Sequence, residues 1–276
     1  MGNFMQQLLL YIVIGAIAGS IAGAIIKLAG PRINALNPHP QWQRYGAIIA
    51  GAVAGVIVFA IGIAIISGGA SREQKVLDEI RSYRFIQVLE KHQPGAREQI
   101  EALVHDAVSK NDPSIAQARA TQLAQQYFPQ YVPRTSDDAI VGFAKNLVDV
   151  LTYFETNDAE TCKSLATGGT MAGKNVPTER MLPIVDSMAD VIQDAATKPQ
   201  APPDAARATP LVQSVVAKLY AGNDPKLIPP QMLVTPAAAP ADRLCYTMRS
   251  FYATVLSLPK ADASLVLRQL ISGTMK

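Results

Sequence analysis

The chain has 276 residues, 49% of them apolar, and a net charge of +3 that is unevenly distributed. Residues 1–70 contain three basic residues and no acidic one, whereas residues 71–276 contain 22 basic and 22 acidic residues. This division excludes a single soluble domain with a uniform surface, and it argues against a nucleic-acid-binding protein, which carries its excess basic charge on a folded face. The high and regularly patterned apolar content also argues against disorder.

Two long apolar runs predict a transmembrane helical hairpin in residues 1–70. The runs Leu8–Ile26 and Gly46–Ile66 contain 19 and 21 residues without a charge. As helices they are roughly 29 and 32 Å long, which matches the ~30 Å hydrocarbon core of a bilayer. They are too long and too uniformly apolar for amphipathic core helices, and the first exceeds a signal-peptide core. We therefore expect spans at about 8–28 and 46–67, joined by a short loop, with the lipid bilayer as a partner.

Both expected spans carry glycine at four-residue spacing, namely Gly15, Gly19 and Gly23 in the first and Gly51 and Gly55 in the second. Small residues at this spacing let helix backbones approach closely, which favours association inside a membrane. The pattern resembles a glycine zipper, a resemblance that covers only the hairpin and implies no function. These glycines either pack the hairpin against itself or also build a homo-oligomer.

Loop charge and cysteine content bear on the side of the membrane. The loop between the spans is basic, which places it in the cytoplasm and both termini outside, although the basic residues in 71–84 argue for the opposite arrangement. Cys162 and Cys245 can form one disulfide in an oxidising compartment, or they are two buried thiols. Together these arguments favour a two-span protein of the bacterial inner membrane, with residues 71–276 in the periplasm.

Apolar residues recur at helical spacing throughout residues 71–276, and no alternating strand pattern interrupts them. The prediction is therefore an all-α fold, a two-span hairpin followed by an α-helical bundle. The expected helices are 71–93, one with Pro94 at its first position, 112–128, a long helix capped by Ser136, a short one capped by Asn157, one capped by Thr178, and helices over 211–220, 241–258 and 261–271.

Breaks in this pattern predict the domain organisation. The hairpin of residues 1–70 precedes a helical domain over 71–196. A linker rich in Pro and Ala occupies 197–210, and a C-terminal helical subdomain over 211–276 packs on the former. Within that subdomain, residues 222–240 contain five prolines and are expected to form an extended surface segment.

A stretch resembling a phosphate-binding loop lies at residues 168–175, where GGTMAGKN fits the spacing G-x-x-x-x-G-K. Asn175 occupies the place of the Ser or Thr that binds magnesium, and a helix rather than a strand is expected before the motif. Val176 and Pro177 interrupt the helix that should follow. We therefore interpret the stretch as an ordinary loop.

Other candidate catalytic groups are few and scattered. A nucleophilic pair of Cys162 with His92 or His105 has no local support, and no metal-ligand spacing occurs. Paired carboxylates can serve glycan hydrolysis, but on amphipathic helices they usually form a solvated face. This second interpretation applies to Glu90, Glu98, Glu101 and Asp106. The sequence therefore predicts no catalytic, cofactor-binding or metal-binding residue.

These observations favour a non-enzymatic, membrane-anchored helical module that binds an unknown protein partner or stabilises an assembly of the cell envelope. A small homo-oligomeric channel or holin-like pore with a helical cap is the alternative, because small residues can line a pore. A tethered envelope hydrolase is the third hypothesis. The expected spans contain no titratable residue, which disfavours an ion-coupled transporter.

Overall fold

The computed structural model describes residues 71–110, 123, 126–166, 178–233 and 236–272. This part of the chain is all-helical and contains no strand. The expected spans at 8–28 and 46–67 and the glycines Gly15, Gly19, Gly23, Gly51 and Gly55 lie outside the described residues, as does the loop at 168–175. Among the helices that the structure describes, none is both long and apolar enough to cross a bilayer.

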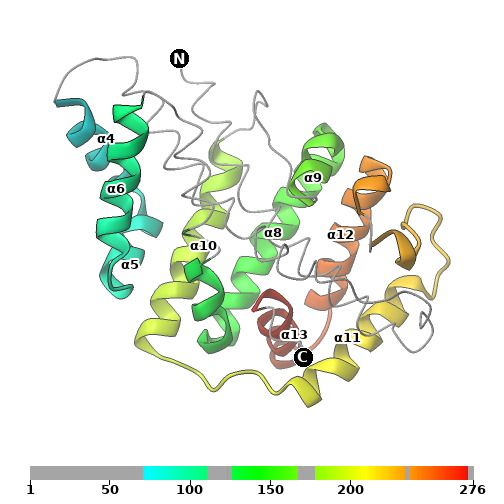
Figure 1. Ribbon diagram of the computed structural model, residues 1–276. Coiled ribbons are helices and arrows are strands. Elements are labelled where there is room, and N and C mark those ends of the chain that lie inside the picture. Colours follow the sequence, from blue (N-terminus) through cyan, green and yellow to red (C-terminus); the bar gives the residue numbers. More distant parts are fainter. Residues whose placement is uncertain (1–70, 111–122, 124–125, 167–177, 234–235, 273–276) are drawn as a thin grey trace, which may run out of the picture.

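The helices form a bundle in which most of the longer axes run in similar directions, while the helix labelled α11 crosses the view obliquely (Figure 1). In chain order the elements are α4 (Ser71–Ser82), α5 (Arg84–His92), α6 (Ala96–Ser109), the 3-10 turn η3 (Val132–Arg134), α8 (Asp137–Asn157), α9 (Ala159–Ala166), α10 (Thr178–Thr197), α11 (Ala205–Tyr220), the 3-10 turns η4 (Pro230–Leu233) and η5 (Pro236–Ala238), α12 (Ala241–Leu256) and α13 (Lys260–Ile271). A further helical stretch over 126–131 leads into η3.

The helix predicted over 71–93 is wrong as one element, because the chain breaks at Tyr83 into α4 and α5. The backbone of Tyr83 is extended, with φ −78° and ψ 127°. At 100° per residue, one straight helix would turn the apolar residues of α4 and those of α5 toward roughly opposite sides. The break lets α4 pack on α6 while α5 packs on α10.

The predicted start of the next helix at Pro94 also differs from the structure. Gly95 precedes α6 with φ +80°, a left-handed conformation that a residue with a Cβ adopts at a cost. Pro94 therefore lies in the turn, and α6 begins at Ala96.

The 21-residue helix α8 occupies the centre of the bundle and contacts α10, α12 and α13. Ser136 caps its first turn, as predicted, with its hydroxyl accepting a hydrogen bond from the Ala139 N–H at 3.4 Å. Asp194 of α10 reinforces this start, since its Oδ2 accepts hydrogen bonds from Ser136 N and Thr135 Oγ1. The apolar face of α8 is fully buried and consists of Ile140, Phe143, Ala144, Leu147, Val150, Leu151 and Phe154.

The remaining boundaries show which residues act as caps. Asn157 was expected to cap the short helix but is instead the last residue of α8. Asp158 takes that role for α9, because its carboxylate accepts from Thr161 N at 3.0 Å and from Thr161 Oγ1 at 2.6 Å. The carboxylate has a second acceptor oxygen that the Asn157 amide lacks, so it can satisfy both donors.

The extended connection is shorter than the predicted linker. It covers residues 198–204, and α11 begins at Ala205. Asp204 caps α11, because its carboxylate accepts a hydrogen bond from the Ala206 N–H at 2.9 Å. Gln200 N donates to Arg134 O at 2.7 Å, and Arg268 Nη1 donates to Ala201 O at 3.1 Å. These bonds fasten the connection to η3 and α13.

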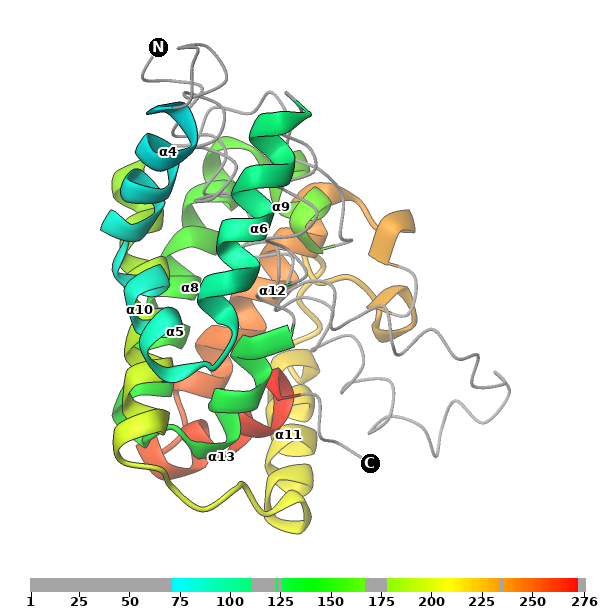
Figure 2. The same cartoon turned by 60° about the vertical axis from the view of Figure 1, so that its left-hand side comes forward.

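One hydrophobic cluster joins all these helices. Figure 2 shows α4, α5 and α6 as a layer on the side of α10 and α8 that faces away from α11. On the other side, α12 and α13 pack on α8, and α11 packs on α12 and α13. The cluster includes the fully buried rings Phe85, Phe128, Phe143, Phe154, Phe251 and Tyr252. Helices from both sides of the 198–204 connection therefore share one core.

Candidate functional site

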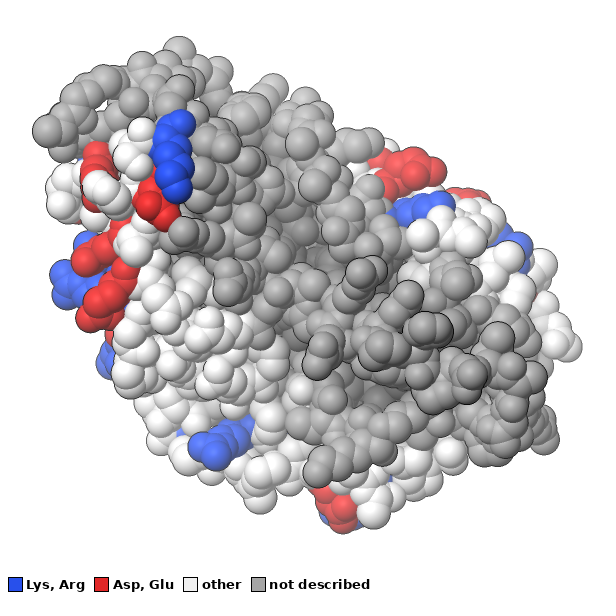
Figure 3. Space-filling view, in the orientation of Figure 1, with Lys and Arg blue, Asp and Glu red and all other residues white. Residues whose placement is uncertain are grey.

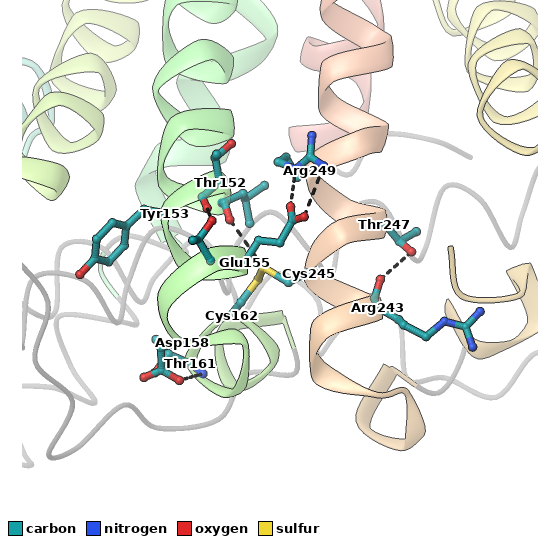
Figure 4. The surroundings of a disulfide bond; sticks show 12 residues. Thr152, Tyr153, Glu155, Asp158, Thr161, Cys162, Arg243, Cys245, Thr247 and Arg249 are labelled. Atoms are coloured by element: carbon teal, nitrogen blue, oxygen red, sulfur yellow. Dashed lines mark hydrogen bonds and ion pairs between the residues drawn. A yellow bond between two sulfur atoms is a disulfide. The ribbon is translucent and has the colours of Figure 1, made fainter. Parts of the chain in front are cut away.

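The most elaborate group of polar contacts lies along α12, which contacts α8 and α9 as well as residues 221–229. At its base, Cys162 of α9 and Cys245 of α12 form a disulfide with a Cα–Cα distance of 5.7 Å (Figure 4). Both cysteines are completely buried. Cys245 Sγ also lies 3.7 Å from Leu151 O, a van der Waals contact because a disulfide sulfur carries no hydrogen to donate. The disulfide thus ties the short helix α9 and the end of α8 to α12.

An ion pair lies next to the disulfide and joins the same two parts. Arg249 of α12 bonds Glu155 of α8 through Nε and Oε2, and its Nη2 lies 3.4 Å from Oε1 (Figure 4). Both side chains are 26% exposed. An arginine–carboxylate pair of this two-pronged kind holds two helices in one register.

Tyr246 extends this network toward the proline-rich segment. Its ring lies 5.0 Å from the Arg249 guanidinium and 5.5 Å from Lys226 Nζ, so two cations contact one aromatic ring. The Tyr246 hydroxyl donates to Asp224 Oδ2 at 2.6 Å. This hydrogen bond lowers the pKa of Asp224 and raises the pKa of Tyr246.

Residues 221–229 are fastened to α12 by further hydrogen bonds. Thr247 Oγ1 accepts from Ile228 N at 2.9 Å, and the Arg243 guanidinium donates to Leu227 O. Tyr220 donates to Ile228 O at 2.9 Å, and burial raises the pKa of Tyr220 to about 12, so it remains a donor at neutral pH. Leu227 and Ile228 are buried. The expectation of a purely extended surface segment over 222–240 is therefore wrong.

We call this whole arrangement the α12 loop platform. It consists of residues 221–229 together with Glu155, Arg243, Tyr246, Thr247 and Arg249. Pro225, Lys226 and Pro229 are exposed on its outer side. The backbone of residues 227–228 is hydrogen-bonded to Thr247 and Arg243 of α12. The platform is therefore a rigid, mixed-charge surface with no unpaired general base among its contacts.

The acidic candidates Glu90 and Glu101 belong to a separate ion network at the other side of the molecule. Arg81 of α4 bonds Glu90 through Nε at 2.9 Å and Glu101 through Nη2 at 2.6 Å. The hydrogen bond from Arg81 lowers the pKa of Glu101, and the same bond raises the pKa of Arg81. Figure 3 shows acidic and basic side chains lying next to each other at the edge formed by α4 and α6. Glu98 is exposed and Asp106 half-buried on the same helix, α6.

The two histidines of the described region lie apart from Cys162. His92 contacts Gln193 Oε1 at 3.1 Å, and His105 Nδ1 lies 3.2 Å from Glu73 Oε2. Cys162 is bonded to Cys245 and carries no thiol. A nucleophilic pair of Cys162 with either histidine is therefore not formed. Among the described residues, no group of three or more His, Cys, Asp or Glu side chains is placed to hold a metal ion.

The chain matches no protein-family model, no curated protein and no solved structure.

The pairings around Arg249 were not predicted from the sequence. A weak signal exists, since Cys245 and Arg249 are four residues apart and Tyr246 and Arg249 are three apart, which places all three along one side of a helix. Nothing in the sequence indicates that Glu155, 94 positions away, supplies the carboxylate.

Proposed function

We propose that this chain is a membrane-anchored, non-enzymatic helical module of the cell envelope, whose helical domain binds a protein partner or stabilises an assembly. The observation that carries the proposal is the pair of uncharged runs at 8–26 and 46–66, each long enough to cross a bilayer. They are followed directly by a well-packed helical domain, so the domain is held at the membrane from its first helix.

The disulfide supports a position on the oxidising side of the membrane. Stable disulfides form in compartments such as the periplasm and are rare in the cytosol. The loop between the two runs carries Lys27, Arg32 and Arg44 and no acidic residue, which favours a cytoplasmic loop with both termini outside. We therefore propose a bacterial inner-membrane protein with residues 71–276 in the periplasm.

The α12 loop platform is the surface that we propose for the partner. A binding surface gains affinity when its loop is already held in one conformation, because less conformational entropy is lost on binding. The hydrogen bonds from Thr247 and Arg243 hold the loop backbone in this way. Pro225, Lys226 and Pro229 are exposed on it, and so are free to contact a partner.

Two experiments on the full chain test this proposal. The first is carbonate extraction of membranes, in which an anchored protein remains in the pellet; release into the supernatant refutes the anchor. In the second, a photo-crosslinking amino acid replaces exposed Pro229 on the platform, with exposed Lys91 of α5 as the matched control site. A discrete adduct from position 229 alone supports the platform, whereas equal adducts from both sites, or none from either, argue against it.

A homo-oligomeric pore is the second candidate, and the glycine spacing in the two runs is the observation that favours it. Close helix packing through Gly15, Gly19 and Gly23 could build a ring of hairpins with a narrow, uncharged lumen. Reconstitution of the full chain into liposomes separates the candidates, because a pore produces single-channel conductance and an anchor does not.

A further inference from the structure

The short connection before α4 restricts how the helical domain can sit on a membrane. The second apolar run ends at Ile66 and α4 begins at Ser71. Four residues separate them, so their Cα atoms are five steps apart, at most about 18 Å, and the headgroup layer alone is roughly 5–8 Å thick. If the run crosses the bilayer, the first turn of α4 therefore begins no farther than about 10–13 Å beyond the headgroup layer.

Other helix ends lie at the same end of the bundle as Ser71. The contact of His105 with Glu73 brings the last turns of α6 to the first turn of α4. Figures 1 and 2 share the same vertical axis, and in both the start of α4, the end of α6 and the start of α10 lie at the upper end. We call this end the α4 pole. The end of α10 and the 198–204 connection lie at the opposite end.

The α4 pole carries side chains suited to a lipid surface. Leu182 lies near the start of α10 and is 36% exposed. Among the described residues it is the one large hydrophobic side chain that is exposed. Arg180 beside it is exposed, and its guanidinium lies 5.8 Å from the Tyr153 ring centre. Lys75 and Lys110 are also exposed at this pole. Long cationic side chains can reach lipid phosphates while an apolar neighbour enters the headgroup layer.

A single exposed leucine is ordinary on a protein surface. Leu182 is significant here because the short chain between Ile66 and Ser71 limits how far the α4 pole can lie from the bilayer. The domain is tethered within about 18 Å of the bilayer by its α4 end, and Leu182 lies at that end. We propose that the α4 pole rests against the lipid surface, with Leu182 in the headgroup layer. This inference rests on the proposed membrane anchor. It leaves the opposite pole directed away from the bilayer.

Tryptophan quenching in the full chain tests the orientation. The chain has one tryptophan, Trp42, and Trp42→Phe provides a background without one. Leu182→Trp then reports on the α4 pole, and Ala196→Trp is the matched control. Ala196 is exposed on the same helix; at 14 residues' separation it lies on nearly the same face and roughly 21 Å farther along the axis. Both variants are reconstituted in phosphatidylcholine vesicles with and without brominated acyl chains.

We expect bromolipid to reduce the emission of Leu182→Trp about twofold, because the headgroup layer brings the ring within contact range of the acyl chains. Ala196→Trp should keep its emission. Equal quenching at both positions, quenching of Ala196→Trp alone, or quenching at neither overturns the orientation. Lys110→Trp, at the end of α6, provides a second reporter of the same pole if Leu182→Trp fails to fold.

Flotation of the same vesicles distinguishes the two possible failures. A chain that does not float with the vesicles refutes the membrane anchor itself. A chain that floats but shows any of the contrary quenching patterns refutes only the orientation of the domain.

Discussion

Removal of the disulfide tests how much the covalent link between α9 and α12 stabilises the fold. Its oxidation state in the isolated protein tests whether the domain lies in the periplasm. Cys162 and Cys245 are 83 positions apart in the sequence. In the chain-entropy model, opening a closed loop of this length lowers the free energy of unfolding by about 4–5 kcal/mol at 25 °C. For a urea dependence of about 2 kcal/mol per molar, this corresponds to a fall of roughly 2 M in the urea midpoint. We expect Cys162→Ala/Cys245→Ala to show a shift of this order.

Pulse proteolysis of the full chain in lipid nanodiscs measures the urea midpoint without requiring an isolated fragment. The control is reductant. It should lower the midpoint of the wild-type chain toward that of the double variant, while leaving the variant unchanged. Alkylation of freshly isolated, denatured protein gives the oxidation state at the same time. The reasoning fails if the wild-type midpoint does not change when both thiols become free, and two reactive thiols before reduction would remove the support for a periplasmic domain.

Three further predictions concern the spans and the platform. Gly19→Ile should weaken crosslinking between copies of the chain in detergent if the glycines build an oligomer, because a β-branched side chain holds helices apart; unchanged crosslinking leaves only packing within the hairpin. Arg249→Ala should lower the free energy of unfolding by about 1–3 kcal/mol, since it leaves the half-buried carboxylate of Glu155 unpaired, and Glu155→Gln in the same chain should recover part of the loss in urea midpoint. The hydrogen bond from Tyr246 lowers the pKa of Asp224 in the folded protein. The stabilisation of the fold by this bond is therefore complete above the usual carboxyl pKa near 4. It is lost as the pH falls through the lowered pKa of the folded state. Tyr246→Phe should therefore lower the urea midpoint at pH 7 and converge with wild type in acid, and a constant difference down to pH 2 would contradict this.

The helical class and much of the core were predictable from the sequence because they depend on local periodicity. Ile140, Leu147 and Phe154 recur at seven-residue spacing, which places them on one face of α8, and all three are buried. The cap at Ser136 was predictable for the same reason, since a capping hydroxyl bonds an N–H only three residues away.

The break at Tyr83 was missed because neither Gly nor Pro occurs between Ser71 and Gln93, and the usual local signals of a helix end are therefore absent. What ends α4 is the arrangement of its partners, because its apolar side packs on α6 while that of α5 packs on α10. Burial of both sides offsets the loss of helical hydrogen bonds at the junction.

The sequence by itself determined that the described part of residues 71–276 is mainly helical, which of its residues face a core, and that two apolar runs long enough for a bilayer precede it. It also limited any intramolecular disulfide to one pair of cysteines. Only the tertiary structure decided that Glu155 meets Arg249, that Tyr246 meets Asp224, and that residues 221–229 are held against α12. These pairs are 94 and 22 positions apart. Helix formation depends on neighbours within one turn, whereas contacts between helices depend on how all the apolar faces are buried at once, which no local pattern contains.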